Sequence, residues 1–148
     1  GAVLWRRDGD LPQRTKLRRA RTRARARHDD LARRFSEAGE ALARGAYALK
    51  LKRTREGVKW LLKARAVKLP PGSEPAEMRQ RLEKEIEGLF REEEEKARKL
   101  GEAGDYPGAI QGYENLLKRF PLPEVEKELR RKIADLLQKL RGLGPGGW

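Results

Sequence analysis

Residues 96–121 read KARKLGEAGDYPGAIQGYENLLKRFP, and this stretch decides the fold because it contains two helical patterns joined by a turn. Small and apolar residues recur every three or four positions on both sides of Gly104 and Asp105, as they do on one face of an α-helix. Asp105 is a typical N-cap, and Pro107 fits the first turn of the helix that follows it. Pro121 marks the end of that helix. The stretch therefore predicts a helical hairpin.

The same punctuation extends the helical pattern over most of the chain. Gly45 and the run Pro70-Pro71-Gly72 end two predicted helices, and Ser73 provides an N-cap for another. No run of alternating β-branched residues interrupts the pattern. We therefore expect an all-α protein of stacked helical hairpins, with about five helices and a basic N-terminal helical arm. The expected helices cover residues 14–44, 47–68, 74–103, 106–119 and 123–141.

Two of these expected helices carry an apolar face that is wide enough to contribute to a core. The face of the helix at 74–103 consists of Met78, Leu82, Ile86, Leu89, Phe90, Ala97 and Leu100. The face of the helix at 123–141 consists of Val125, Leu129, Ile133, Leu136, Leu137 and Leu140. Opposite the first face lies the acidic run Glu92–Glu95, which we interpret as solvated helix surface.

The chain also contains two similar segments, which indicate an internal duplication. The aligned pairs are residues 45–47 with 104–106, 56–63 with 111–118, and 77–89 with 124–136, at shifts of 59, 55 and 47. Such unequal shifts arise when loops change length between two divergent helical repeats. The sequence therefore predicts a helical-repeat domain at 31–141, with copies at about 31–90 and 91–141. A basic arm at 1–30 precedes this domain, and a flexible Gly-rich tail at 142–148 follows it.

The second copy resembles a tetratricopeptide repeat, the unit of a family in which helical hairpins stack into a scaffold. The resemblance rests on the small residues Ala97 and Ala109, the turn Gly104-Asp105-Tyr106, Tyr113 and the closing Pro121. It implies that the small residues let paired helices approach closely and that the tyrosines fill the space beside them. It also implies a groove that accepts an extended segment or a helix of a protein partner. Extended through Leu140, the same stretch is also similar to MIT domains, which are three-helix modules that bind helical peptide motifs.

The residue types that catalysis requires are scarce in this chain. It has no Cys and one His, His28, together with two Ser and three Thr. A Ser-His-Asp arrangement is therefore hard to assemble, and a Cys-based zinc site cannot exist. The phosphate-binding spacings GxGxxG and GxxxxGK[ST] do not occur. Because the many carboxylates stand at helical spacing among Lys and Arg, as on solvated faces, we expect no enzymatic activity, no cofactor and no metal site.

Positive charge is concentrated in the first half of the chain. Residues 1–70 contain 21 Lys or Arg and 7 Asp or Glu, whereas residues 71–148 contain 15 and 16, so the net charges are +14 and −1. The densest part is residues 14–34, which include Arg18, Arg19, Arg21, Arg23, Arg25 and Arg27. On a helix that turns by about 100° per residue, charges at every second position are distributed around the whole circumference. We therefore expect this helix to project from the core and to contact something anionic.

Three kinds of partner fit such a segment: an acidic protein surface or peptide, anionic lipid headgroups, and the phosphates of nucleic acid. We expect a scaffold or interaction subunit of a larger protein assembly, and an RNA- or DNA-associated protein is the alternative. Within the helical domain, the candidate residues for an acidic partner are Lys52, Arg55, Lys59 and Lys63, which recur at helical spacing. A solvated surface explains these four residues equally well, and a solvated arm is the alternative for the arginines.

Both ends of the sequence contain candidate contacts. The opening GAVLWRR places apolar residues before Trp5 and a pair of arginines, as the last turn of a membrane helix does. The alternative is a short tail that packs Leu4 and Trp5 on the domain. At the other end, Trp148 follows a Gly-rich run and is a candidate docking residue. We expect a cytoplasmic protein, which lies at the cytoplasmic face of a membrane if the opening is juxtamembrane.

Overall fold

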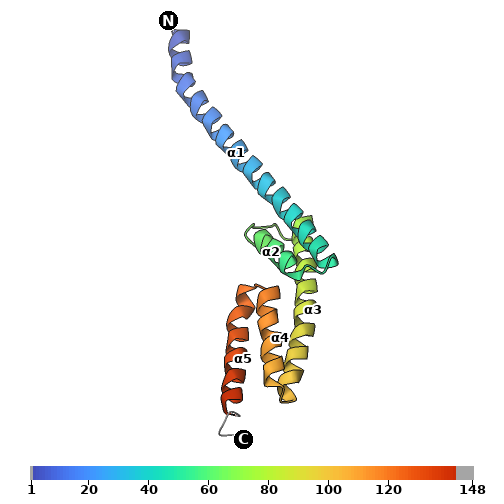
Figure 1. The fold of residues 1–148 in the computed structure, drawn as a ribbon. Coiled ribbons are helices and arrows are strands. Elements are labelled where there is room, and N and C mark those ends of the chain that lie inside the picture. The colour runs from blue at the N-terminus through green and yellow to red at the C-terminus, as the bar shows by residue number, and fades with distance from the viewer. Residues whose placement is uncertain (1, 143–148) are drawn as a thin grey trace. The chain divides into compact units, whose positions relative to one another are not determined.

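Residues 2–142, the part of the chain that the structure describes, form five α-helices, as expected from the punctuation of the sequence. The structure is a computed structural model that describes the backbone of residues 2–142 and the side chains of residues 14–142. The helices are α1 (Ala2–Lys50), α2 (Thr54–Arg65), α3 (Glu74–Glu102), α4 (Tyr106–Arg119) and α5 (Pro123–Gly142), shown in Figure 1. The residues so described contain no β-strand. The prediction of an all-α protein with about five helices is therefore confirmed.

The chain divides into two compact units, residues 1–37 and residues 38–148. The first unit is helical throughout its described part. Within it, residues 14–34 are here called the arginine segment. The second unit contains the end of α1 together with α2 to α5, and its described part, residues 38–142, is here called the helical domain. All of the described hydrophobic residues that are buried belong to the helical domain.

The end of α1 and the whole of α2 form the first hairpin, and two glycines stand where these helices meet. A Cβ atom on Gly57 would lie 2.8 Å from Leu49 Cδ2 and 3.2 Å from the carbonyl oxygen of Gly45. A Cβ atom on Gly45 would lie 3.2 Å from Trp60 Cβ and 3.3 Å from the carbonyl oxygen of Gly57. The two backbones can therefore approach this closely only because neither position carries a side chain.

This contact explains why the predicted end of a helix at Gly45 is wrong. The glycine lies inside α1, which continues to Lys50, and the turn follows at residues 51–53. Glycine is permissive for a helix end, but it is also the residue that close helix packing requires, and here packing is its role. The predicted second helix at 47–68 consequently begins only at Thr54 and ends at Arg65.

The second hairpin, formed by α3 and α4, is closed by small residues in a similar way. A Cβ atom on Gly112 of α4 would lie 2.9 Å from Ala97 Cβ of α3, and one on Gly101 would lie 3.6 Å from Ala109 Cβ. Ala97 and Ala109 are almost completely buried. The side chain of Asp105 accepts a hydrogen bond from the Gly108 amide at 3.0 Å and caps the N-terminus of α4, as the sequence predicts.

Aromatic side chains fill the space beside these small residues. Tyr113 is buried, which raises the pKa of its hydroxyl because burial disfavours the phenolate. Phe120 is buried where α4 ends and packs edge-on against Phe90 of α3, with ring centroids 5.4 Å apart. Tyr106 and Pro121, which we also expected to pack, are half-buried. Phe120 is the aromatic core residue that the sequence reasoning missed.

The segments 56–63 and 111–118, which align in the sequence, have nearly the same burial pattern. Val58 and Tyr113 are buried at one aligned position, and Leu61 and Leu116 are buried three positions later. Gly57 and Gly112 also align, and each stands at a close contact with the helix that precedes its own. The alignment of residues 45–47 with 104–106 has no structural counterpart. Residues 45–47 lie inside α1, whereas Gly104 and Asp105 lie between α3 and α4.

The helical domain is held together at its surface by ion pairs that connect different helices. Arg65 of α2 lies 3.2 Å from Glu83 of α3 and 2.9 Å from Glu124 of α5. Partial burial opposes ionisation of Arg65, but the hydrogen bonds to these two carboxylates raise its pKa above the ordinary value. The arginine therefore stays charged and joins three helices.

Two expectations about α3 and α5 need correction. Glu93 and Glu94 are half-buried and reach Arg119 of α4 at 3.8 Å and Lys132 of α5 at 3.7 Å, so this part of the acidic run is not merely solvated. Three members of the predicted apolar faces, Leu100, Leu137 and Leu140, are exposed. α4 packs against both α3 and α5 (Figure 1).

The glycine contact in the first hairpin predicts a specific loss of stability. We expect Gly57→Ala to lower the free energy of unfolding by about 1–2 kcal/mol, because the added methyl group clashes with Leu49 and separates α1 from α2. The matched control is Gly88→Ala in α3, where nothing lies within 4 Å of the added Cβ atom. This control should raise stability by about 0.5–1 kcal/mol through helix propensity. Urea unfolding followed by circular dichroism measures both changes, and equal effects would contradict the packing account.

Candidate functional site

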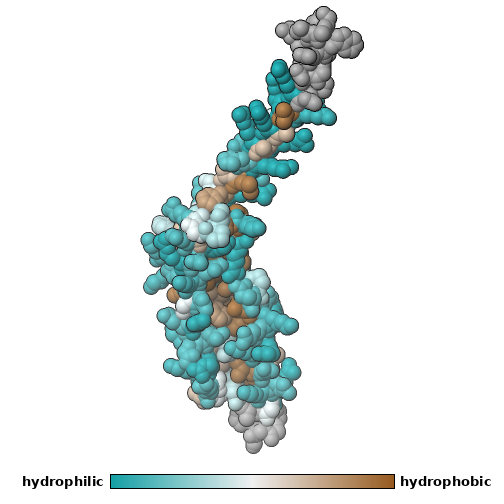
Figure 2. All heavy atoms as spheres, turned by 180° about the vertical axis from the view of Figure 1, so that it is seen from behind, coloured by the Kyte–Doolittle hydropathy of each residue, from teal (hydrophilic) through white to brown (hydrophobic). Residues whose placement is uncertain are grey.

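The arginine segment is a continuous, highly charged stretch of α1. Between Arg14 and Arg27 the chain carries eight Lys or Arg residues and no Asp or Glu. Arg, Ala and Leu are strong helix formers, so intrinsic propensity supports the helix despite the repulsion between its charges. Residues 14–29 are all exposed, and Figure 2 shows hydrophilic side chains along most of this stretch.

The charges of the arginine segment form two stripes on opposite sides of the helix. Residues three or four apart share a face, which places Arg14, Arg18, Arg21 and Arg25 on one side. The other stripe contains Lys16, Arg19, Arg23 and Arg27. The two sets are offset by two residues, or about 200°, so they lie on opposite sides. The expectation of an even distribution around the circumference is therefore too simple.

These arginines differ from Arg33 and Arg34, at the other end of the arginine segment, in having no ion pair among the described residues. Among the residues that the structure describes, no carboxylate pairs with any arginine from Arg18 to Arg27. Pairing begins at Asp30, which binds Arg33 at 2.6 Å and Arg34 at 3.2 Å. In α3 and α5, ion pairs between neighbouring turns are frequent, for example Arg130 with Glu126 at 2.9 Å. The arginine segment therefore carries the largest uncompensated charge.

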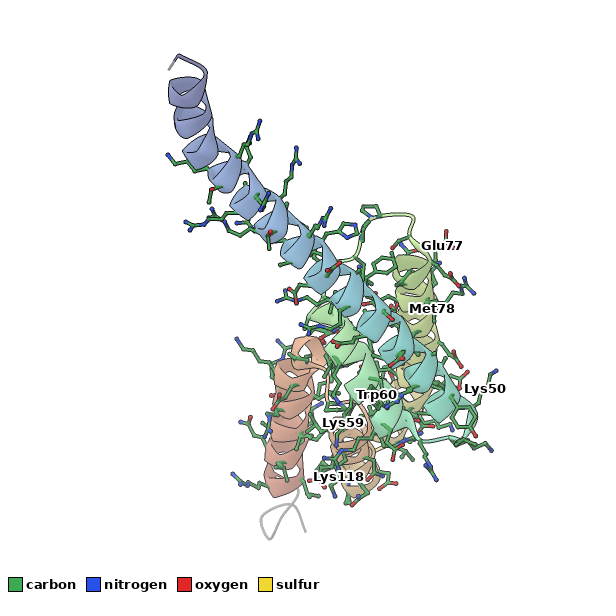
Figure 3. The ribbon with its side chains drawn as sticks, turned by 90° about the horizontal axis from the view of Figure 1, so that it is seen from above. Lys50, Lys59, Trp60, Glu77, Met78 and Lys118 are labelled. Atoms are coloured by element: carbon green, nitrogen blue, oxygen red, sulfur yellow. The ribbon has the colours of Figure 1, made fainter. Side chains whose placement is uncertain are left out.

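A second basic site lies at the turn between α1 and α2. Three of the four predicted residues, Lys52, Arg55 and Lys59, line one shallow recess there. Arg53 and Arg119, which the sequence analysis did not single out, line the same recess. We call these five residues the basic cluster. Figure 3 labels Lys59 next to Trp60 on α2.

Arg119 joins the basic cluster from the end of α4, far away in the sequence. Its guanidinium donates a hydrogen bond to the hydroxyl of Thr54 at 3.3 Å, and Thr54 is buried. Glu93 of α3 lies 3.8 Å from Arg119, and within the cluster Glu56 lies 3.9 Å from Arg53 with both side chains largely exposed. An exposed pair of this kind compensates little charge. The cluster can therefore bind an anion.

The backbone at this turn adds to the positive potential. Arg53 is the N-cap of α2 and its side chain makes no capping hydrogen bond, so the first amides of the helix point outward without a side-chain acceptor. Lys52 has a φ of 60°, a left-handed conformation that glycine would adopt without strain. A lysine at a position that suits glycine stores strain, and such strain is common at binding sites.

Lys63, the fourth predicted residue, does not belong to the basic cluster. Its ammonium group lies over the ring of Trp60, 4.4 Å from the ring centroid, and the guanidinium of Arg44 lies 5.1 Å from the same centroid. Both distances are within the range of cation–π contacts. Trp60 is half-buried at the surface of the first hairpin.

The residues that sequence reasoning missed are Arg44, Arg53 and Arg119. Arg53 lies beside three predicted residues, so its neighbours in the sequence were a usable signal. Nothing in the local sequence connects Arg119 with Lys52, because the turn of α2 and the end of α4 meet only through packing. Nothing in the local sequence connects Arg44 of α1 with Trp60 of α2 either, because these two residues meet only where the helices pack.

Several sequence expectations fall outside what the structure describes. Trp148 and the side chains of Leu4 and Trp5 lie outside the described residues. Within the described part, no helix has a stretch that is both long and apolar enough to span a bilayer. The described side chains also include no group of three or more His, Cys, Asp or Glu residues that could hold a metal ion.

The strained turn predicts a stabilising substitution. We expect Lys52→Gly to raise the free energy of unfolding by about 1 kcal/mol, because glycine adopts the left-handed conformation of this position without a steric penalty. Lys50→Gly, which removes the same charge from the last residue of α1, should instead lower it by up to about 1 kcal/mol. Urea unfolding at moderate salt distinguishes the two. A destabilised Lys52→Gly variant would show that the turn does not store strain.

Comparison with family models, with curated proteins and with solved structures finds no match to this chain. The geometry described above is therefore the basis for a functional conclusion. It consists of two opposite arginine stripes without counter-charges, a basic cluster at the turn between α1 and α2, and Trp60 with cations over its ring.

Proposed function

We propose that this chain is a non-catalytic interaction subunit of a larger protein assembly. The helical domain acts as its scaffold, and the arginine segment binds an acidic protein surface. The observation that carries this proposal is the absence of counter-charges for Arg18 to Arg27 among the described residues. Uncompensated cations repel one another, and an anionic surface that covers them relieves this repulsion. An anionic partner is therefore expected to bind at this segment rather than at the surface of α3 and α5, where the cations already have ion pairs.

The packing of the helical domain supports the scaffold part of the proposal. Gly57 and Gly112 occupy aligned positions and each stands at a close contact between the two helices of a hairpin. Paired hairpins with small residues at their contacts are what the tetratricopeptide resemblance implies, and a three-helix MIT-like arrangement of α3 to α5 is the second choice. In either case the domain would present surfaces between helices to an extended or helical segment of a partner.

The non-catalytic part of the proposal rests on residue chemistry. The chain lacks Cys, and its single His, His28, lies on the exposed surface of the arginine segment. Nucleophilic and acid–base catalysis draw on residue types that are few here. The positively charged recess at the turn between α1 and α2 is suited to holding an anion rather than to transferring a proton.

We include a cytoplasmic location at the face of a membrane in the same proposal. Anionic lipids of the cytoplasmic leaflet attract basic segments by about 1 kcal/mol per Lys or Arg near the surface. Between the two arginine stripes lies a narrow apolar line, in which Leu17 and Leu31 are 60% and 64% exposed. Two leucines provide little area for insertion into lipid, so contact with a membrane would be mainly electrostatic.

One observation favours nucleic acid as a second candidate partner. A helix in the major groove of a duplex, which is about 12 Å wide, has phosphates on both sides. Two opposite stripes of arginine match this arrangement, whereas a flat acidic surface contacts one stripe at a time. An RNA- or DNA-associated protein that uses the arginine segment is therefore the alternative function.

Native isolation from the source organism distinguishes the two functions. The complex is isolated in mild detergent with and without nuclease, and the proteins that co-elute are identified by mass spectrometry. We expect protein partners in a fixed ratio that does not change with nuclease. Partners that disappear with nuclease would contradict the scaffold function and favour nucleic acid, whose binding should also weaken by about 10³–10⁵ between 50 and 200 mM salt.

Charge-matched variants test whether the arginine segment makes the attachment. The first variant replaces Arg18, Arg19, Arg21, Arg23, Arg25 and Arg27 by Gln. The control removes the same number of charges by replacing Arg79, Arg81, Arg91, Lys127, Arg130 and Arg131, all of them in α3 or α5. We expect only the first variant to lose the partners, with helix content checked by circular dichroism. Equal losses would mean that net charge, and not the arginine segment, determines the attachment.

A further inference from the structure

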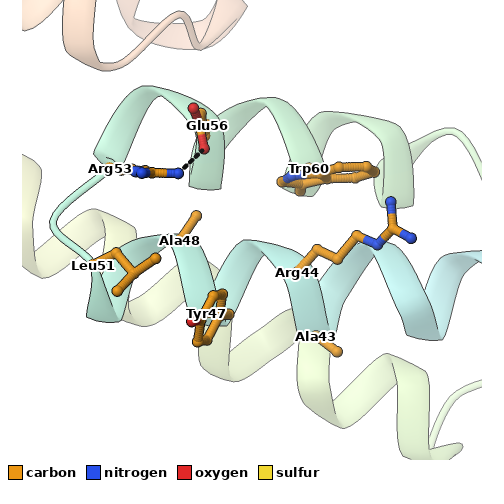
Figure 4. A pocket seen from close by; sticks show the side chains of 8 residues that line it. All are labelled: Ala43, Arg44, Tyr47, Ala48, Leu51, Arg53, Glu56 and Trp60. Carbon is orange, nitrogen blue, oxygen red and sulfur yellow. Dashed lines mark ion pairs between the residues drawn. The ribbon is translucent and has the colours of Figure 1, made fainter.

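A recess of about 370 Å³ lies between the end of α1 and α2 (Figure 4). Trp60 and Arg44 stand at one end of it, and Leu51 and Arg53 stand at the other. Tyr47 lies between the two ends on α1. The recess is thus mainly apolar and aromatic in the middle, with Arg44 at one end and the ion pair of Arg53 with Glu56 at the other. Its volume lies at the lower end of the range of ligand pockets, which is about 300–1,000 Å³.

The apolar residues of this recess are exposed in a way that the fold does not require. Tyr47 of α1 and Leu51, the first residue after this helix, are 63% and 47% exposed and lie four residues apart. The core-facing side of the same helix is formed by other residues, among them Leu42 and Leu49, which are buried. Exposed Tyr and half-buried Trp, together with Arg, are the residue types that most often dominate binding energy at protein interfaces.

The surroundings of the recess carry a strong positive charge. From Arg44 to Lys63 the chain contains seven Lys or Arg residues and one acidic residue, a net charge of 7 − 1 = +6. Over residues 74–142, by contrast, 15 basic and 16 acidic residues give 15 − 16 = −1. The acidic residue of this hairpin, Glu56, lines the recess, and its contact with Arg53 is long, at 3.9 Å, and exposed. A ligand of negative charge is therefore attracted to this hairpin and not to the rest of the domain.

We infer that this recess is the docking site for an acidic peptide segment of a protein partner. The segment inserts one aromatic or large aliphatic side chain between Tyr47 and Trp60, and its carboxylates pair with Arg44 and Arg53. This inference rests on the proposed function and specifies its partner. The juxtaposition of an exposed aromatic recess with a +6 hairpin carries it.

The chemistry of Trp60 favours a peptide over a nucleobase. Arg44 and Lys63 already lie over its ring at 5.1 and 4.4 Å, which is the position that a stacked base would take. A peptide side chain can contact the ring edge and Tyr47 while both cations remain in place. The same cations then pair with flanking Asp or Glu residues and strengthen the contact.

Selection from an unbiased displayed library of random peptides tests this inference. The bait is the full chain in which the six arginines of the arginine segment are replaced by Gln, so that this segment cannot enrich acidic peptides by itself. We expect the enriched peptides to share an aromatic or large aliphatic residue flanked by Asp or Glu. Enrichment of no peptide, or of peptides without this pattern, would overturn the inference.

Variants of the recess then locate the binding site. We expect Tyr47→Ser combined with Leu51→Ser, and separately Arg44→Gln, to weaken the selected peptide by at least tenfold. These side chains are exposed, so the fold should survive, and circular dichroism verifies that it does. The matched controls Leu137→Ser and Arg91→Gln change an exposed leucine and an exposed arginine elsewhere and should leave the affinity unchanged. Unchanged affinity in the recess variants would also overturn the inference.

Fluorescence gives an independent readout at the recess itself. With Trp5→Phe and Trp148→Phe, Trp60 is the single tryptophan of the chain. The selected peptide should shift the emission of Trp60. As peptide is added, this shift should saturate with the same affinity as binding does. A 12-nucleotide oligothymidylate should neither shift this emission nor displace the peptide, and displacement would indicate a nucleic-acid site instead.

The native isolation separates failure of this inference from failure of the proposed function. If the Tyr47→Ser, Leu51→Ser variant still co-elutes with its protein partners without sensitivity to nuclease, the scaffold function stands and the recess is not its docking site. If the partners depend on nucleic acid, the proposed function fails together with the inference.

Discussion

The close contact between Gly45 and Gly57 is the constraint on which the first hairpin depends. Because neither residue has a side chain, the backbones of α1 and α2 approach so closely that a Cβ atom on either glycine would lie 3.2 or 3.3 Å from the carbonyl oxygen of the other. That approach places Trp60 beside Arg44 and sets the width of the recess between the two helices. It also obliges α1 to continue past Gly45, so that the turn falls at Lys52 and brings the basic residues of this turn together.

The second hairpin uses the same principle with a different residue pair, and the two hairpins are then joined by charge. Ala97 faces Gly112 at the contact of α3 with α4. Arg65 connects α2 with carboxylates on α3 and α5, and Arg119 at the end of α4 binds the buried Thr54 of α2. Small residues therefore determine how closely helices approach within a hairpin, and arginines determine how neighbouring hairpins are joined.

The distribution of charge has a physical consequence for the protein as a whole. In α3 and α5 most basic side chains have an acidic neighbour one turn away, so the surface there is nearly neutral. The arginine segment and the first hairpin have few such neighbours and carry almost all of the net charge. A field of this kind selects anionic partners and increases their rate of encounter, but it does not choose between protein, lipid and nucleic acid. That choice depends on the shape and the apolar surface beside the charge, which is why the recess at Trp60 is informative.

By itself, the sequence determined the helical class, the number of helices, the turn at Gly104 and Asp105, and the location of the charge. Each of these depends on local periodicity, capping or composition, which a single chain segment expresses. Only the tertiary structure decided that Gly45 is a packing residue, that Arg119 joins the basic cluster, that Lys63 lies over Trp60, and that Glu93 is paired. The physical reason is that these roles depend on which surfaces meet, and helices far apart in the chain meet according to the shape of their packed faces, which local sequence does not encode.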